Sequence, residues 1–589
     1  MSRCDPHSWC DDGQAVTRHL DLSWKVDVAA RVLEGEVRLT FAAPATGPLD
    51  LDSRGLIVAG IRTHRDEPVD WSVDESDPVL GERLRLELPT GTEAVTIRYR
   101  TGPAASALGW LDPIQTTGGR HPFLFTQCQP IHARSLVPCQ DTPRHRVTYT
   151  ALVDVPAPLR AVMSAAPGGD EPAGPGRTRW RFAMPQAIPT YLLALAVGDL
   201  DRRDLGPRSR IYAEPDMIDA AAWEFAEVEA MIRAAERLFG PYEWDRFDLL
   251  LMPPAFPYGG MENPRLTFLT PTLLSGDRSL VNVVVHELAH SWTGNLVTNA
   301  TMNDFWLNEG FTVYAERRIL EELHGREFAD LQGVLRRNAL QVHLDQFGPD
   351  SPLTKLRTDL AGIDPDEVYS LVPYEKGAQF VILLERAVGR PRFDAFLREY
   401  IDRFRFRSIT TDEFIAFLEE ELPGVLDAVD GRRWIDGPGM PANEHRTSAP
   451  ALDRLRALAA GWSAGARPGP ESAAWSPTEL QLFLQDLPRP LPHDDCRWLD
   501  EAFALTGRGN HEVLVEWLTI AARSGYAPVR PRLRQVLGRV GRMKYLKPLY
   551  GALMAAGDDG PAFAREVFAA AAPGYHPLSR GSLKNIVGT

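Results

Sequence analysis

Two histidines four residues apart, with a glutamate directly after the first, occur in the stretch VVHELAHSWTGN, Val284 to Asn295. On an α-helix such residues lie about 40° apart around the axis, so the imidazoles of His286 and His290 can converge on one ion. Neutral imidazoles suit zinc, and a carboxylate beside the metal can take a proton from its bound water without being a ligand. The pattern therefore predicts a hydrolytic metal site with Glu287 as the general base.

The alternative is that the two histidines share a solvated helix face by accident, and a third ligand is needed to decide. The metzincin extension H-x-x-G-x-x-H is absent, since Thr293 and Leu296 stand where Gly and His are required. The later helical segment NDFWLNEGFTVYAERRILEEL offers Glu309, which two antiparallel helices joined by a short loop would bring to the ion. Glu316, two turns further on, either accepts a hydrogen bond from a ligand histidine or is an exposed charge.

The elements that must position these residues follow from the hydrophobic periodicity. From about residue 19 to 205 apolar and polar residues alternate, as in Leu20, Leu22, Trp24 and Val26, which predicts a β-sheet domain with one buried face. From about residue 216 the period becomes helical, as in AAAWEFAEVEAMIRAAERLFG, ended by Gly240-Pro241. The metal motif therefore lies in a second, mainly helical domain.

A turn-rich stretch, PGMPANEHRTSAP, predicts a linker, and the amphipathic segments after it predict stacked helical hairpins. The sequence thus predicts a multidomain α+β protein. Its parts are an N-terminal β domain (1–205), a catalytic domain (206–437), a linker (438–450) and a C-terminal α-helical domain (451–589).

Composition narrows the functional classes for this chain of 589 residues, of which 44% are hydrophobic and 24% charged. No apolar run approaches the ~20 residues of a membrane-spanning helix, and the first residues show no secretory pattern. The five cysteines are too few and scattered for a disulfide framework, so we expect a reducing, cytoplasmic location. The net charge of −15 argues against general nucleic-acid binding and favours cationic ligands.

H-E-L-A-H followed by W-L-N-E-G and preceded by YGGMENP resembles the gluzincin aminopeptidases of the M1 family. The blocks TQCQPIHARSLVPCQDTP, YSLVPYEKG, RSITTDEF and GRMKYLKPL are similar to its branch of leukotriene A(4) hydrolase and aminopeptidase B. The resemblance implies a saddle-like β domain, a thermolysin-like catalytic domain and a C-terminal armadillo- or HEAT-like helical domain. It also implies one Zn²⁺ per chain, bound by His286, His290 and Glu309.

The same resemblance implies roles around the substrate's amino end. Glu262 would grip the free α-ammonium, with Tyr258, Gly259, Gly260 and Met261 beside it and Gln127 and Gln129 lining the same pocket. Tyr374 would donate a hydrogen bond to the developing oxyanion, a role for which one donor is worth ~3 kcal/mol of barrier. From the pattern alone, the alternatives are loop hydrogen bonding for the glutamines and a core aromatic for Tyr374.

Four further positions are implied by the branch. Asp366 and Tyr369 would select the first side chain, and a buried aspartate at the end of that pocket would favour basic residues, so we expect basic or small amino-terminal residues. Arg542 and Lys544 would bind the far carboxylate of a short peptide, whereas the neighbouring arginines fit a solvated helix face.

The expected function is therefore a zinc-dependent aminopeptidase, monomeric, acting on short peptides with a free amino end. The alternatives are a bifunctional epoxide hydrolase of the leukotriene A(4) type, and a catalytically silent peptide-binding scaffold. The scaffold is disfavoured because every expected catalytic group is present.

Overall fold

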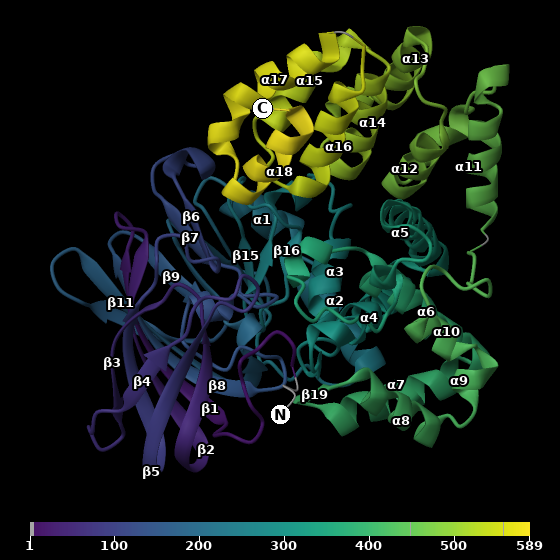
Figure 1. Ribbon diagram of the computed structural model, residues 1–589. Coiled ribbons are helices and arrows are strands. Elements are labelled where there is room, and N and C mark those ends of the chain that lie inside the picture. Colours follow the sequence, from purple (N-terminus) through teal and green to yellow (C-terminus); the bar gives the residue numbers. More distant parts are fainter. Residues whose placement is uncertain (1–4, 448, 558, 589) are drawn as a thin grey trace.

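The N-terminal part of the chain forms two β-sheets, shown in purple and blue in Figure 1. The computed structural model describes residues 5–447, 449–557 and 559–588. The larger sheet has the order β10-β11-β8-β1-β2-β5-β3, with β4 paired to β5. Its strands are β1 (Thr17–Asp27), β2 (Val32–Ser53), β3 (Ile57–Thr63), β4 (Asp70–Val73), β5 (Glu82–Arg100), β8 (Arg146–Pro156), β10 (Ala166–Pro172) and β11 (Arg177–Pro189). The smaller sheet contains β6 (Leu108–Leu111), β7 (Phe123–Thr126), β9 (Arg160–Met163) and β12 (Leu195–Gly198).

The alternating pattern of this part produces the predicted one-sided burial. In β1, Leu20, Leu22, Trp24 and Val26 are buried, while the residues between them point to solvent. Successive side chains of a strand point to opposite faces, so one apolar face packs into the core. The prediction of an N-terminal β domain is confirmed.

The central part begins with a mixed five-stranded sheet of order β13-β14-β15-β17-β16. Its strands are β13 (Asp201–Asp204), β14 (Arg210–Ala213), β15 (Leu249–Leu251), β16 (Gly260–Met261) and β17 (Thr267–Leu269). The boundary predicted at residue 205 falls inside the β13–β14 hairpin. Hairpin pairing, which periodicity does not reveal, makes β13 part of this five-stranded sheet. The domain limits themselves stay a prediction.

Helices make up most of the central part. They are α1 (Ile218–Glu224), α2 (Val228–Phe239), α3 (Asn282–Ala289), α4 (Trp306–His324), α5 (Arg326–Phe347), α6 (Gly377–Val388), α7 (Arg390–Phe404), α8 (Thr411–Glu421), α9 (Val425–Ala428) and α10 (Gly431–Asp436). The pair β18 (Val297–Asn299) and β19 (Arg407–Ile409) joins the α3–α4 connection to the segment before α8. The helical stretch predicted to end at Gly240 does end there, at φ +96°, although it divides into α1 and α2.

The C-terminal part is helical, as predicted, and lies across the other two parts (Figure 1, light green to yellow). Its helices are α11 (Pro450–Ala460), α12 (Pro477–Asp486), α13 (His493–Phe503), α14 (His511–Arg523), α15 (Arg530–Leu537), α16 (Met543–Met554), α17 (Asp559–Ala571) and α18 (Pro577–Val587). Before α11, the described residues of the predicted linker form no helix or strand, and Ser448 of that linker lies outside the described residues.

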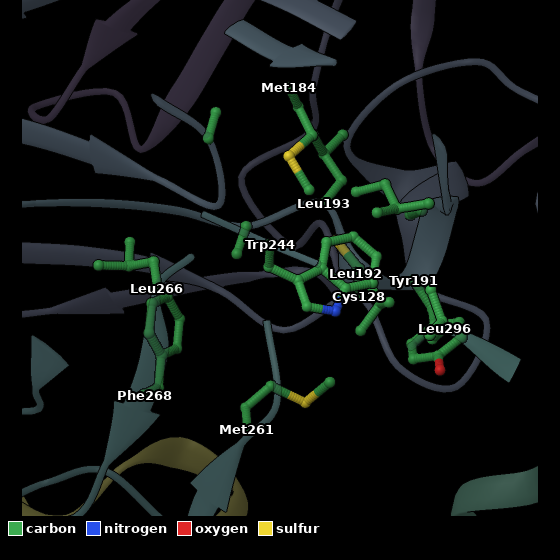
Figure 2. Close-up of a cluster of buried hydrophobic side chains, with 14 of the residues drawn as sticks. Cys128, Met184, Tyr191, Leu192, Leu193, Trp244, Met261, Leu266, Phe268 and Leu296 are labelled. Carbon is green, nitrogen blue, oxygen red and sulfur yellow. The ribbon is translucent and has the colours of Figure 1, made fainter. Parts of the chain in front are cut away.

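One hydrophobic core runs without interruption from the β domain into the central part. Figure 2 shows Cys128, Met184 and Leu192 of the first part gathered around Trp244, with Met261 and Phe268 of the second. Met261 anchors the Gly-Gly-Met-Glu-Asn segment, residues 259–263, in this core. Within the described residues, no helix combines the length and the apolar character that a membrane crossing requires.

Candidate metal centre and active site

Helices α3 and α4 bring three potential metal ligands together. His286 lies on α3, His290 follows its last residue, and Glu309 lies in the first turn of α4. The two imidazole Nε2 atoms are 3.2 Å apart, and Glu309 Oε2 lies 3.5 Å and 3.6 Å from them. Tetrahedral zinc with bonds of about 2.0–2.1 Å sets its ligand atoms roughly 3.3 Å apart. The three side chains therefore have the spacing of a zinc site.

Hydrogen bonds on the far sides of the ligands direct their lone pairs inward. His286 Nδ1 lies 3.0 Å from Glu316 Oε2, and His290 Nδ1 lies 3.2 Å from the carbonyl oxygen of Thr293. Each Nδ1–H then donates outward, which leaves Nε2 as the metal-facing lone pair. Glu309 Oε2 is buried and has no hydrogen-bond partner in the described structure, which fits an oxygen that coordinates an ion.

The electrostatics of the protein groups favour a positive charge at this point. Burial lowers the pKa of His286, but the neighbouring carboxylates of Glu309 and Glu316 outweigh burial and raise that pKa well above its usual value. Burial lowers the pKa of His290 to about 4, so that ring stays neutral and can act as a ligand. The donor set therefore fits a divalent cation such as zinc.

A close approach of two glycines positions Tyr374 beside these ligands. A Cβ on Gly310 of α4 would lie 2.8 Å from Cα of Gly377, so only glycine allows α4 to pack this tightly against the start of α6. The π-helical turn Val372–Lys376 just before α6 carries Tyr374, whose ring stacks on His286 at 6.3 Å and 22°. Burial and the nearby Glu309 raise the pKa of Tyr374, so its hydroxyl remains a proton donor.

Glu287 lies on α3 next to the ligands and faces the Gly-Gly segment. A Cβ on Gly260 would come within 2.2 Å of Glu287 Oε1, so a larger residue there would displace the carboxylate. With the protein groups alone, burial raises the pKa of Glu287 to about 8, and a bound cation would lower it. In this position the carboxylate can accept and return a proton.

Several residues predicted to bind the substrate's amino end lie beside Glu287. Glu262 is only 4% exposed, and its Oε1 accepts a hydrogen bond of 3.1 Å from Gln129 Nε2. Gln127 Nε2 donates to Met261 Sδ at 3.1 Å, so Gln127 braces the segment next to Glu262 in the sequence. Asn295 Nδ2, which the sequence analysis did not single out, donates to the carbonyl oxygen of Glu262 at 2.8 Å. Half-buried Tyr258 and Gly259 complete the segment.

Asp366 does not have the predicted burial. Its side chain is 58% exposed, and Tyr369 is 61% exposed, because the turn that carries them opens to solvent. Asp366 Oδ2 lies 2.8 Å from Nε2 of His132, a residue of the β domain that the sequence analysis overlooked. The prediction of a buried aspartate is therefore wrong, although the Tyr369 ring does lie 6.0 Å from that of Tyr374.

Arg542 and Lys544 reach the site from the C-terminal domain. Met543 N donates to the carbonyl oxygen of Pro257 at 3.0 Å, and Arg542 Nη2 lies 2.6 Å from where a Cβ on Gly259 would be. Lys544 Nζ is bound at 2.5 Å to Glu512 Oε1, a contact that no sequence spacing indicated.

Comparison with known proteins identifies this arrangement. Three family models match the chain: the peptidase M1 N-terminal domain over residues 16–192, the peptidase family M1 domain over 223–434, and the leukotriene A4 hydrolase C-terminal domain over 475–587. Leukotriene A-4 hydrolase of Xenopus laevis is 38% identical over 93% of both chains. The chain belongs to peptidase family M1.

Two further matches agree with the predicted branch of leukotriene A(4) hydrolase and aminopeptidase B. Aminopeptidase B of Rattus norvegicus is 41% identical over 84% of this chain and 77% of its own. The structure of native yeast LTA4 hydrolase matches with a TM-score of 0.92 and 32% identity, over 99% of this chain and 97% of that one. The predicted three-domain fold and zinc aminopeptidase class are confirmed, and the M1 family accounts for the metal-binding character of the site.

Proposed function

We propose that this M1 enzyme removes single residues from the amino ends of short peptides, using one zinc ion per chain held by His286, His290 and Glu309. The spacing of these ligand atoms carries the proposal, because it matches a tetrahedral zinc site and Glu287 lies beside it. Metal analysis of the purified protein tests the count and should give about one zinc per chain.

The chain's own residues supply the remaining chemistry. A zinc ion in this site contributes Lewis acidity and lowers the pKa of water next to it. Glu287 takes the proton of the attacking water and returns it to the leaving amine. The Tyr374 hydroxyl donates to the carbonyl oxygen as negative charge develops there. His286 is held in the correct tautomer by Glu316 throughout.

Glu262 restricts cleavage to the first peptide bond. A free α-ammonium would pair with its buried carboxylate, which already accepts a hydrogen bond from Gln129, and β16 lies at the sheet edge beside it. An internal peptide segment would leave this charge unpaired.

Replacing Glu262 with Gln should lower kcat/KM for an unblocked tripeptide about 100-fold, because the ammonium loses its charged partner in a buried site. The wild-type enzyme should leave the N-acetylated tripeptide intact. Mass spectrometry of a digestion time course measures both rates. Equal cleavage of acetylated and free peptides by the wild type would refute the exopeptidase proposal.

Asp366 selects the first side chain from an exposed position. Its carboxylate is oriented by His132 and can pair with an arginine or lysine side chain, at lower strength than a buried carboxylate would give. We expect Asp366→Asn to reduce the preference for arginine over alanine about ten-fold in kcat/KM. Aminoacyl fluorogenic substrates measure this, and a wild-type enzyme that does not distinguish arginine from glutamate would contradict it.

A second activity, hydrolysis of a lipid epoxide, is favoured by the relative named leukotriene A-4 hydrolase and by the cationic pair Arg542 and Lys544, which could hold a fatty-acid carboxylate. Product analysis after incubation with leukotriene A(4) tests it.

Two further properties belong to the proposal. The described cysteines Cys10, Cys128, Cys139 and Cys496 are free and buried, which supports a reducing, cytoplasmic location. Cell fractionation tests the location, and size-exclusion chromatography with light scattering tests the expected monomer.

A further inference from the structure

The cationic pair at the far end of the site carries its own counter-ion. Glu512 Oε1 accepts from Lys544 Nζ at 2.5 Å and from the Tyr545 hydroxyl at 2.7 Å, and it lies 4.0 Å from Arg542 Nη1. Arg542 Nη1 in turn donates to the Tyr545 hydroxyl at 3.0 Å. Glu512 therefore connects both cations through one oxygen atom.

The backbone fixes Glu512 in this position. It lies in the first turn of α14, where Asn510 Oδ1 accepts from the amides of Glu512 and Val513 at 3.0 Å and 3.1 Å. Asn510 Nδ2 donates to Ser279 Oγ of the catalytic domain at 2.7 Å. The carboxylate is thus placed by a capped helix end that is itself anchored to the domain carrying the metal ligands.

Glu512 keeps its negative charge. Burial would raise its pKa, but Lys544 and Arg542 outweigh burial and lower that pKa to about 2. Arg336, another cation near this group, lies 3.0 Å from Glu375, a carboxylate that it shares with Arg317. Arg542, Lys544 and Glu512 together therefore carry one net positive charge.

We propose that Glu512 is a specificity-determining residue, which limits the attraction of Arg542 and Lys544 so that the site holds one peptide carboxylate and releases it. The inference rests on the proposed function in that the ligand is a peptide with a carboxylate at its far end. Removing the first residue leaves that carboxylate on the product, so a more strongly positive site would retain the shortened peptide. Glu512 thereby sets the balance between capture and release.

Binding of matched peptides tests this inference without cleavage. In the Glu287→Gln background, calorimetry gives Kd for an unblocked tripeptide with a free carboxyl end and for the same tripeptide as its amide. We expect Glu512→Gln to raise the ratio Kd(amide)/Kd(acid) about five-fold, because a like charge next to the ligand is removed while an acceptor for Tyr545 remains.

Two further variants make the result specific. Glu516→Gln, one turn further along α14 and paired with Arg489, should leave the ratio unchanged. Lys544→Gln, at an exposed side chain, should lower the ratio because a cation is lost. A ratio that stays constant or falls in Glu512→Gln overturns the inference, as does failure of either peptide to bind. Failure of the proposed aminopeptidase activity appears separately, as intact peptide after incubation with the enzyme that retains Glu287.

Discussion

Replacing Glu287 with Gln is expected to lower kcat about 1,000-fold while KM for a short peptide changes little. General acid–base catalysis contributes typically 10² to 10⁴ in rate, and an amide cannot accept the water proton or return it to the leaving amine. Glu287 is not a metal ligand in the proposed site. Its substitution therefore removes an interaction that is made only in the transition state, which lowers kcat and leaves substrate binding unchanged.

Glu287→Gln is a close isostere, which separates chemistry from packing. Gly260 lies against the carboxylate, so the variant fills the same space. Its zinc content should equal that of the wild type, and Glu322→Gln, a more exposed glutamate of α4 paired with Arg237, should keep full activity. Steady-state kinetics and metal analysis on the same preparations decide the outcome. A Glu287→Gln enzyme within ten-fold of the wild type, with zinc retained, would rule out its role as the general base.

The metal-binding centre could be predicted from the sequence because most of its residues are close together in the chain. His286, Glu287 and His290 share one helical stretch, so a regular helix alone brings them to one side. Glu309 required a second helix, because it lies in the first turn of α4 and reaches the histidines through the packing of α4 against α3. That packing left no periodic signal in the sequence, and the ligand was predicted by its residue type and its neighbours.

Contacts between segments that are far apart in the chain could not be predicted from the sequence. His132 of the β domain contacts Asp366 of the catalytic domain, and Glu512 of α14 binds Lys544 of α16 within the C-terminal domain. The two residues of each pair are not separated by a helical or strand period, so hydrophobic periodicity cannot predict that they are in contact. The exposure of Asp366 was missed for the same reason, since it depends on how the turn before Tyr374 faces the β domain.

Tyr374→Phe is expected to lower kcat about 100-fold with little change in KM. One donor to a developing oxyanion is worth about 2.7–4 kcal/mol, and phenylalanine keeps the ring that stacks on His286 while removing the hydroxyl. Tyr369→Phe is the matched control, because that exposed ring also packs against Tyr374. Loss of the Tyr369 hydroxyl should lower kcat far less than loss of the Tyr374 hydroxyl.

The pH profile distinguishes donation by Tyr374 from mere packing. Burial raises the pKa of this hydroxyl well above its usual value near 10, so the neutral donor persists throughout the range in which the protein can be assayed. Loss of the hydroxyl should therefore lower kcat by the same factor from pH 6 to about pH 9. A Tyr374→Phe enzyme whose defect appears only at one end of this range would show that the residue acts by shifting the ionisation of Glu287, and the oxyanion role would fail.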